Sequence, residues 1–354
     1  MGKLAVYKYL SFLMLVATFA VAVFTFFGLF GGNVPPAGNT ARAMLVYVLP
    51  LLIIADALLL VYWLIRRRWH WAAIPALTLL CCIPYIGTLF QYHAVDDTAD
   101  SKKGLKIATY NVALFNRETT GFIALDILAQ MKKQKVDVLC MQEYTNVSGN
   151  KTNSESYSTY FPYMAKGKDD MVIYSRYPVT AQKTITFENT NNSAMWADIN
   201  ADGHLVRVVN VHLETTGFSR TMHQAAKLRA NGTDIESNRL LRAIYDKYTW
   251  GMMVRAGQAI TVSNELRKDQ IDGQSLVVCG DFNDVPYSFV YNTLLGNLVD
   301  GFKECGRGRM FTYRGGKSVR IDYIFHDKSL KGLTYYKTDL SYSDHYPVFM
   351  KVEF

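Results

Sequence analysis

The chain has 354 residues, a formal net charge of +8 and hydrophobic side chains at 50% of its positions. This length accommodates one large domain with an appendage, or two domains, and its 5 cysteines, mostly in apolar stretches, do not suggest a disulfide scaffold. The modest positive charge is compatible with an anionic partner, such as nucleic acid or a lipid surface, but identifies neither.

Three apolar stretches near the N-terminus predict three transmembrane helices. They cover about residues 10–30, 43–65 and 71–90. The first holds no charged residue in 21 positions, which is enough for a helix to cross the apolar core of a bilayer. A signal peptide is the alternative for this stretch, but its apolar core is longer than signal peptides usually have. We therefore expect residues 1–93 to form a membrane region.

The basic residues that flank these stretches predict their orientation. Lys3 and Lys8 precede the first stretch and Arg66, Arg67 and Arg68 separate the second from the third. Basic loops stay on the cytoplasmic side of a membrane. Three crossings then place everything after the third stretch in the periplasm or outside the cell. The sequence predicts an integral protein of a plasma or inner membrane.

After the apolar stretches, residues 94–104 are polar without periodicity and predict a linker. Residues 105–354 have the length of a single domain. Strand-like runs recur in it at 105–112, 136–143, 171–179, 195–200, 205–214, 275–283, 320–325 and 346–354. Apolar residues at helical spacing alternate with these runs, most clearly in 122–135 and 237–268. This mixture predicts an α/β or α+β fold.

Six strand-linked segments each contribute one or two polar residues of a few types. They are Asn111, Glu143, His212, Asp281 with Asn283, Asp322, and Asp344 with His345. Each one alone has an ordinary explanation, such as a turn amide, a solvated strand end or a hydrogen-bonded core histidine. Together they provide carboxylate oxygens for a hard divalent cation, amides, and two imidazoles that titrate near neutral pH. The set therefore predicts a site for phosphate-ester chemistry.

Three of these segments, "GDFN" (280–283), "IDYI" (321–324) and "SDH" (343–345), resemble in this order the endonuclease/exonuclease/phosphatase superfamily. That group includes deoxyribonuclease I-like nucleases, abasic-site endonucleases, neutral sphingomyelinases and inositol polyphosphate phosphatases. The resemblance covers roughly 250 of the 354 residues, from about Leu105 to the end, and leaves out the apolar stretches. It implies a four-layer α/β (α+β) sandwich of two packed mixed β-sheets flanked by helices.

The resemblance also implies a role for each residue. Glu143 would be the main metal-binding carboxylate with Asn111 beside it, and Asp281 with Asn283 would orient the attacking water and the phosphate. His345, oriented by Asp344, would contact the phosphate and transfer protons. The implied metal ligands are Asn111, Glu143, Asp322 and Asp344, and the implied catalytic residues are His212, Asp281, Asn283, Asp344 and His345. The implied cofactor is Mg²⁺ or Mn²⁺.

These predictions describe a membrane-anchored, metal-dependent phosphodiesterase that uses in-line attack by water. Its substrate would be nucleic acid, or the head group of a phospholipid or sphingolipid. Basic residues between 307 and 320, namely Arg307, Arg309, Arg314, Lys317 and Arg320, are candidate contacts for a polyanion. Two alternatives stay open: a phosphomonoesterase, and a tethered domain that binds without turnover. The sequence does not indicate the oligomeric state.

Overall fold

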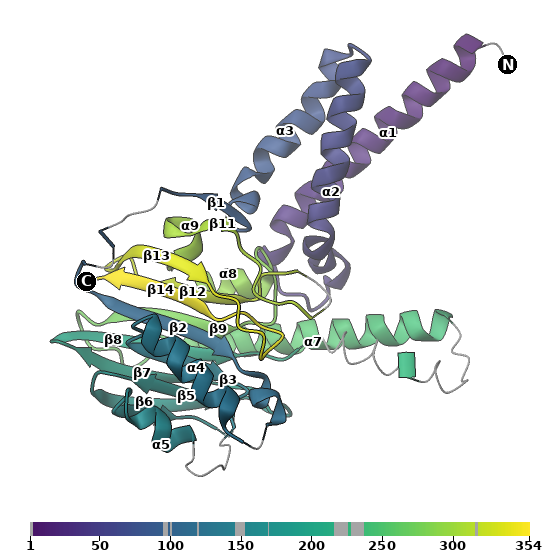
Figure 1. Cartoon of the computed structure of the whole chain (residues 1–354). Coiled ribbons are helices and arrows are strands. Elements are labelled where there is room, and N and C mark those ends of the chain that lie inside the picture. The colour runs from purple at the N-terminus through teal and green to yellow at the C-terminus, as the bar shows by residue number, and fades with distance from the viewer. Residues whose placement is uncertain are drawn as a thin grey trace. The chain divides into compact units, whose positions relative to one another are not determined.

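The chain divides into two compact units. The computed structural model describes residues 3–94, 98–99, 101–118, 120–145, 153–168, 170–215, 226–227, 237–315 and 318–354. Residues 1–88 with 285–292 form the helical unit, and residues 89–284 with 293–354 form the sheet unit. Figure 1 shows the long helices of the first and the strands of the second.

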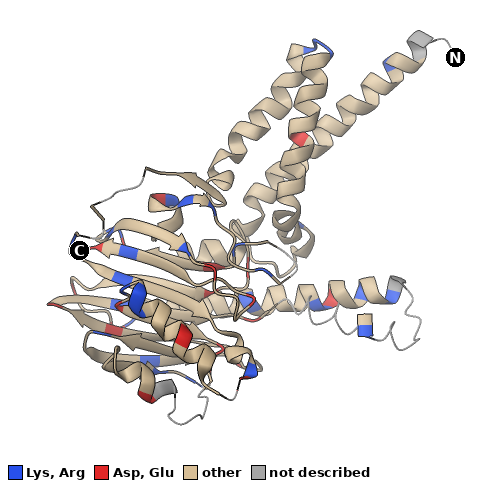
Figure 2. Cartoon of the chain, in the orientation of Figure 1, with Lys and Arg blue, Asp and Glu red and all other residues tan. Residues whose placement is uncertain are grey.

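The helical unit contains three long apolar helices: α1 (Lys3–Phe30), α2 (Thr40–Ile65) and α3 (Trp69–Ile86). A 3₁₀ turn, η1 (Gly31–Asn33), follows α1. All three helices are long and apolar enough to cross a membrane. Figure 2 shows few charged residues along them. They agree with the predicted apolar stretches in number and order.

Two polar contacts join α1 to α2 within the apolar helices. Thr25 Oγ1 donates a hydrogen bond of 2.8 Å to Asp56 Oδ2, and Trp63 Nε1 donates one of 2.9 Å to Thr18 Oγ1. Asp56 and Thr18 are fully buried. A hydrogen bond lowers the penalty of burying a polar group in an apolar surrounding. The hydrogen bond from Thr25 therefore explains how Asp56, an acid in the second apolar stretch, can be buried there.

The described part of the sheet unit contains two six-stranded mixed sheets. One runs in the order β13 (Lys331–Lys337), β14 (Val348–Glu353), β2 (Leu105–Asn111), β3 (Val138–Gln142), β5 (Val172–Ser175) and β4 (Tyr163–Lys166). The other runs in the order β10 (Val299–Asp300), β12 (Asp322–His326), β9 (Ser275–Asp281), β8 (His204–His212), β7 (Ser193–Ala201) and β6 (Val179–Thr186). The pairs β2–β3 and β8–β9 are parallel, whereas the other pairs are antiparallel. A short ribbon, β1 (Phe90–Tyr92) with β11 (Arg307–Arg309), is separate.

Helices flank these sheets. The remaining elements are η2 (Ala113–Arg117), α4 (Phe122–Lys133), α5 (Asn153–Ser158), α7 (Ser237–Glu265), α8 (Phe289–Leu295) and α9 (Gly301–Cys305). The helices expected in 122–135 and 237–268 correspond to α4 and α7. Ile127 and Met131 of α4 are fully buried in one apolar cluster with the outer face of the first sheet. Lys183 on β6 forms an ion pair of 2.6 Å with Glu265 on α7, which links that helix to the second sheet.

One apolar cluster lies between the two sheets and another lies under α4, because the central strands are apolar on both faces. On β2, Ile107 belongs to the cluster between the sheets, and Ala108 belongs to the cluster under α4. Side chains of successive strand residues point to opposite faces, so a strand covered on both faces reads as a continuous apolar run. Each large apolar side chain buried in this way contributes about 1.5–3 kcal/mol. The predicted sandwich of two mixed sheets flanked by helices is confirmed.

Candidate active site

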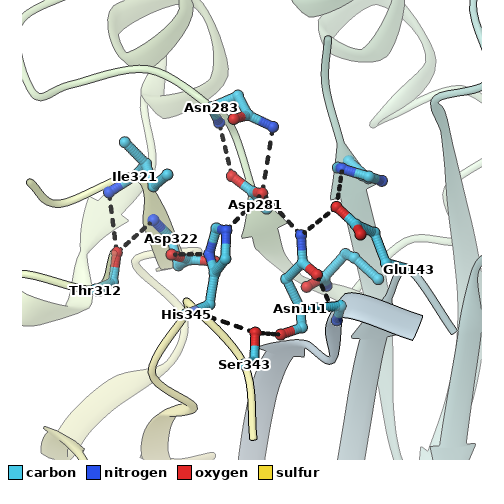
Figure 3. Close-up of polar contacts among 12 residues, drawn as sticks. Asn111, Glu143, Asp281, Asn283, Thr312, Ile321, Asp322, Ser343 and His345 are labelled. Atoms are coloured by element: carbon cyan, nitrogen blue, oxygen red, sulfur yellow. Dashed lines mark hydrogen bonds and ion pairs between the residues drawn. The ribbon is translucent and has the colours of Figure 1, made fainter. Parts of the chain in front are cut away.

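The strand register brings the ends of three neighbouring strands together. His212 at the end of β8 pairs with Asp281 at the end of β9, and Asp281 pairs with Asp322 at the start of β12. Asn111 ends β2 in the other sheet, yet its Nδ2 donates a hydrogen bond of 3.1 Å to Asp281 Oδ2. Figure 3 shows the side chains of Asn111, Glu143, Asp281, Asp322 and His345 in one cluster. The two sheets therefore meet at this cluster.

Asp281 lies at the centre of the cluster and is 1% exposed. Its Oδ1 accepts a hydrogen bond of 2.9 Å from the backbone N–H of Asn283, and its Oδ2 accepts one of 3.2 Å from Asn283 Nδ2. Burial raises the pKa of Asp281 to about 6, although the charge of the nearby His345 lowers it. A carboxylate with a pKa near 6 can accept a proton at neutral pH and release it again.

His345 faces two carboxylates. Its Nδ1 lies 3.0 Å from Asp322 Oδ2, and its Nε2 lies 3.6 Å from Asp281 Oδ2. Burial disfavours its charged form, but the charges of Asp322 and Asp281 outweigh burial and raise the pKa of the imidazole to about 10. His345 is therefore a cation at neutral pH, and its Nδ1 is held in place by Asp322.

The structure corrects one expectation about His345. Asp344 was expected to orient the imidazole, but its side chain is exposed whereas His345 is 5% exposed. Asp322 takes the orienting position through its 3.0 Å contact with the imidazole. The backbone carbonyl of Asp344 accepts a hydrogen bond of 2.8 Å from the Arg314 N–H. The metal-binding role of Asp344 stays a prediction.

Glu143 and Asn111 form the other side of the cluster. Glu143 follows β3, its side chain is 39% exposed, and its Oε1 accepts a hydrogen bond of 3.1 Å from Asn111 Nδ2. Asn111 is 1% exposed, and its Oδ1 accepts a hydrogen bond of 3.0 Å from the Ala113 N–H. Its amide therefore bridges the carboxylates of Glu143 and Asp281. Glu143 is the more accessible of these two carboxylates.

His212 has a partner that the sequence analysis missed. Its Nδ1 lies 3.0 Å from Asp170 Oδ2, and its Nε2 lies 3.8 Å from Glu143 Oε1. Burial lowers the pKa of His212, but the contact with Asp170 and nearby carboxylates outweigh burial and raise it. Asp170 lies just before β5 in the polar segment "KGKDD", where nothing in the sequence marks one acid over the next.

Two hydroxyl groups, also missed, hold the backbone of the cluster. Thr312 Oγ1 accepts hydrogen bonds of 3.0 Å from the N–H groups of Ile321 and Asp322. Ser343 Oγ donates a hydrogen bond of 2.7 Å to the carbonyl of Asn111 and accepts one of 3.1 Å from the His345 N–H. Serine and threonine are too common in loops to signal such contacts from sequence alone.

The basic residues between 307 and 320, which were predicted to contact a polyanion, differ in their exposure and in their partners. Arg320 is 1% exposed and forms hydrogen bonds of 2.6 and 2.8 Å with Asp300, so it is not a surface contact. Arg314 donates to Asp339 Oδ1 at 2.8 Å and to the carbonyl of Leu340 at 2.7 Å. Arg307 and Arg309 lie on β11 and are exposed. Lys317 lies outside the described residues.

The donor chemistry of the cluster fits a hard divalent cation. The carboxylates of Asp281 and Asp322 lie together beside His345, with one polar atom of each of the three residues within 4.8 Å of the others. Glu143 and Asn111 add oxygen atoms, which are the ligands that Mg²⁺ and Mn²⁺ prefer. The described part of the chain therefore contains a possible metal site beside two buried imidazoles.

Comparisons with known proteins agree with this geometry. Residues 108–345 match the Endonuclease/Exonuclease/phosphatase family, and residues 11–89 match a domain of unknown function. A search of curated proteins found no match.

Solved structures share the fold of the sheet unit. Truncated Caenorhabditis elegans TDP2 is 14% identical over 71% of this chain and 98% of its own, with a TM-score of 0.53. An endonuclease/exonuclease/phosphatase family protein from Leptotrichia buccalis C-1013-b is 16% identical over 71% of this chain and 100% of its own, with a TM-score of 0.50. At these identities the likeness concerns the fold alone.

Proposed function

The chain belongs to the endonuclease/exonuclease/phosphatase family, and from this membership we propose that it is a metal-dependent phosphodiesterase anchored in a membrane. The chain is a phosphoester hydrolase of that family. One observation carries the finer proposal: the buried side chains of Asp281, Asp322 and His345 have polar atoms within 4.8 Å of one another, beside Glu143 and Asn111. This arrangement suits the hydrolysis of an anionic ester.

The proposed cation is Mg²⁺ or Mn²⁺, and its proposed ligands are Glu143, Asn111, Asp322 and Asp344. Glu143 supports this choice because its carboxylate is both close to the cluster and 39% exposed. Asp344 is exposed next to His345. When bound, such an ion would neutralise the phosphate and stabilise the negative charge that develops in the transition state.

The residues of the chain would carry the proton transfers. Asp281, fixed by Asn111 and by Asn283, is the proposed acceptor for a proton of the attacking water. Removal of that proton contributes roughly two to four powers of ten in rate. The cationic His345 would contact a phosphate oxygen and give a proton to the leaving oxygen from Nε2, and His212, held by Asp170, would be a second imidazole at the phosphate. Attack by water is proposed to be in line, without a covalent enzyme intermediate.

Two classes of phosphodiester are proposed substrates: lipid head groups and nucleic acid. The lipid class is favoured by the three apolar helices, because tethering beside a bilayer raises the local concentration of lipid substrate. The nucleic-acid class is weakened because Arg314 and Arg320 are bound to Asp339 and Asp300. We propose residues 1–93 as the membrane region, 94–104 as the linker and 105–354 as the catalytic domain, on the periplasmic or extracellular side.

A hydrolysis assay on the full chain in detergent tests this function. Bis-p-nitrophenyl phosphate, p-nitrophenyl phosphate, single-stranded DNA and sphingomyelin are offered with Mg²⁺ or Mn²⁺. We expect cleavage of at least one diester, its loss with chelator, and its recovery when the metal is restored. Glu143→Gln and His345→Gln should each lower kcat by about two to four powers of ten.

Matched controls separate the site from general effects. Glu188→Gln and His204→Gln change exposed residues of the same types, and both should keep wild-type activity. Cleavage of the monoester alone would make the protein a phosphomonoesterase. Binding without turnover of any substrate would make it a tethered binding domain, and equal activity in all variants would reject the assigned site.

A further inference from the structure

A polar pocket of the sheet unit lies away from the catalytic cluster. Its volume is about 260 Å³, and its charged lining residues are Lys106, Lys133, Lys135, Asp137, Arg176 and Lys351. Lys106 is near the start of β2, whereas Asn111 ends this strand in the catalytic cluster. Five steps along a strand separate the two residues by about 17 Å. We call these six residues the basic pocket.

The strand register places the pocket residues in one row across the first sheet. Lys351 on β14 is the register partner of Lys106 on β2. The Lys106 carbonyl accepts a hydrogen bond of 2.8 Å from the Asp137 N–H, and the Asp137 carbonyl accepts one of 2.9 Å from the Arg176 N–H. Like charges directly opposite each other on paired strands destabilise a sheet. An anion bound between Lys106 and Lys351 would remove that repulsion.

The end of α4 adds two more lysines to the pocket. Lys133 is the last residue of the helix, and Lys135 has a φ of 53°. That left-handed position after a helix usually holds glycine, and it costs another residue about 1 kcal/mol. The last carbonyls of α4, including Met131 O and Lys132 O, already accept backbone N–H groups. The helix end therefore presents its lysines to the pocket, with its carbonyls already hydrogen-bonded.

The lining has five cationic side chains and one carboxylate. That carboxylate, Asp137, already accepts hydrogen bonds of 2.8 Å from Arg176 Nη1 and 2.9 Å from the Lys106 N–H. Lys351 is only 8% exposed, and its Nζ donates to the carbonyl of Ala99 at 2.9 Å. Figure 2 shows basic residues gathered at one end of α4 and on the strands beside it. A partly buried excess of positive charge favours an anion.

We propose that the basic pocket binds a phosphate group, either as a free phosphorylated anion or as the head group of an anionic lipid. Lysine ammonium groups and an arginine fork are the usual ligands of phosphate oxygens in proteins. This site lies outside the catalytic cluster, so it adds a binding function to the proposed hydrolysis.

Calorimetric titration tests the proposal. The full chain in nanodiscs of phosphatidylcholine is titrated with inorganic pyrophosphate in chelator, so that no divalent cation supports binding at the catalytic site. Lys106→Gln with Lys135→Gln should weaken binding by at least about tenfold, because two charge-assisted contacts are lost. Lys303→Gln with Lys328→Gln removes the same charge from exposed positions outside the pocket and should leave the Kd within about twofold.

His345→Gln separates the two sites. Binding at the basic pocket should persist in this variant, whereas its loss would place the pyrophosphate in the catalytic cluster and overturn the proposal. No binding by the wild type, or equal weakening in both lysine pairs, would also overturn it. Thermal melting checks that the variants are folded. If the variant with Lys106→Gln and Lys135→Gln does not fold, the variant with Lys133→Gln and Lys135→Gln replaces it, because both of these lysines are exposed.

The source of the phosphate is distinguished by lipid composition. In nanodiscs that contain phosphatidylglycerol, a lipid head group in the pocket would compete with pyrophosphate and raise its apparent Kd. An unchanged Kd in those nanodiscs would assign the pocket to a free phosphorylated anion. The pocket variant, but not the control, should abolish any such dependence on lipid.

Discussion

Asp322 illustrates how one side chain can fix the chemistry of its neighbour. Its carboxylate lies 3.0 Å from His345 Nδ1 and is 1% exposed, and its own N–H is held by Thr312 Oγ1. The carboxylate therefore has one orientation, and it holds the imidazole so that Nε2 faces Asp281. A buried carboxylate behind a catalytic histidine fixes the ring and stabilises its charge.

Replacing Asp322 with asparagine should change both the rate and its pH dependence. We expect kcat on the diester to fall by about two powers of ten or more. Asp322 raises the pKa of His345, so its removal lowers that pKa from about 10. Because the cationic imidazole is the proposed active form, the loss of activity at alkaline pH should begin at a lower pH. A pH profile of kcat measures this shift.

Asp272→Asn is the control, because Asp272 is exposed in a turn. It should leave both kcat and the profile unchanged. A lower kcat in Asp322→Asn with an unchanged alkaline limb would mean that Asp322 does not act through His345.

The sequence predicted which residues gather but not how they pair. His212, Asp281 and Asp322 were recognised because each is a polar residue within or at the end of an apolar strand-like run. The partners of the two histidines were not, since pairing depends on which way a side chain points. Asp344 adjoins His345 in sequence and is exposed, whereas Asp322, on another strand, contacts the imidazole.

Among the elements, the parallel pair β8–β9 depends on a glycine. Gly280 has a φ of 133° and is the register partner of Val211, and an added Cβ would collide with the Val211 carbonyl oxygen. His212 and Asp281 are the next residues on the two strands. The close approach of these backbones therefore sets the spacing of two site residues.

Gly280→Ala should separate these strands and disturb the site. Overpacking in a closed interior costs about 1–3 kcal/mol, and the positive φ adds about 1 kcal/mol. We expect a melting temperature lower by several degrees, together with a loss of hydrolysis. Circular dichroism during heating measures the first effect.

Gly257→Ala in α7 provides the control, because a Cβ there meets no atom within 4 Å. Alanine is favoured over glycine in a helix by about 1 kcal/mol, so this variant should melt no lower than the wild type. Equal melting of the two variants would exclude the predicted collision.

At the end of α4, glycine can be introduced instead of removed, and one such substitution should stabilise the protein. Lys135 has a φ of 53°, so glycine should relieve strain there and stabilise the protein by about 1 kcal/mol. Lys133 is the last residue of the helix, and Lys133→Gly should destabilise it by up to about 1 kcal/mol. Thermal melting should therefore move in opposite directions in the two variants. A lower melting temperature in Lys135→Gly would show that the backbone of Lys135 is not strained.

Central strands were easier to predict than edge strands. β2, β3, β8 and β9 have neighbours on both sides and read as apolar runs. The edge strands β13, β4, β10 and β6 were missed, and β13 reads "KGLTYYK" with alternating burial. Edge strands carry charges and polar residues that oppose pairing with other chains, so their apolar signal is weak.

At the scale of the whole molecule, the helical unit and the sheet unit have different chemistry. The three apolar helices suit a bilayer by length and composition, whereas the described sheet unit has its own apolar core and a polar site. Composition alone separates residues 1–88 from the sheet unit in the sequence, but it does not mark residues 285–292, which also belong to the helical unit. The register that joins distant strand ends, by contrast, is a property of the folded sheets.

Sidedness is the remaining property that the charges predict. The basic residues lie before the first helix and in the turn between the second and third, where Arg66, Arg67 and Arg68 stand together. Retention of these loops in the cytoplasm would place the sheet unit on the other side. Alkaline phosphatase is active only outside the cytoplasm, so a fusion of this enzyme after Phe354 should be active. A reporter that fluoresces only in the cytoplasm, fused at the same point, should give no fluorescence.

Changing the charges tests the cause of that orientation. Replacing Arg66, Arg67 and Arg68 with glutamine and introducing three lysines between residues 33 and 39 reverses the charge difference across the second helix. We expect this variant to invert in part, because the difference in basic residues between short loops directs insertion. The phosphatase signal should fall and the fluorescent signal should rise. Fluorescence from the wild-type fusion would instead place the hydrolase beside cytoplasmic substrates.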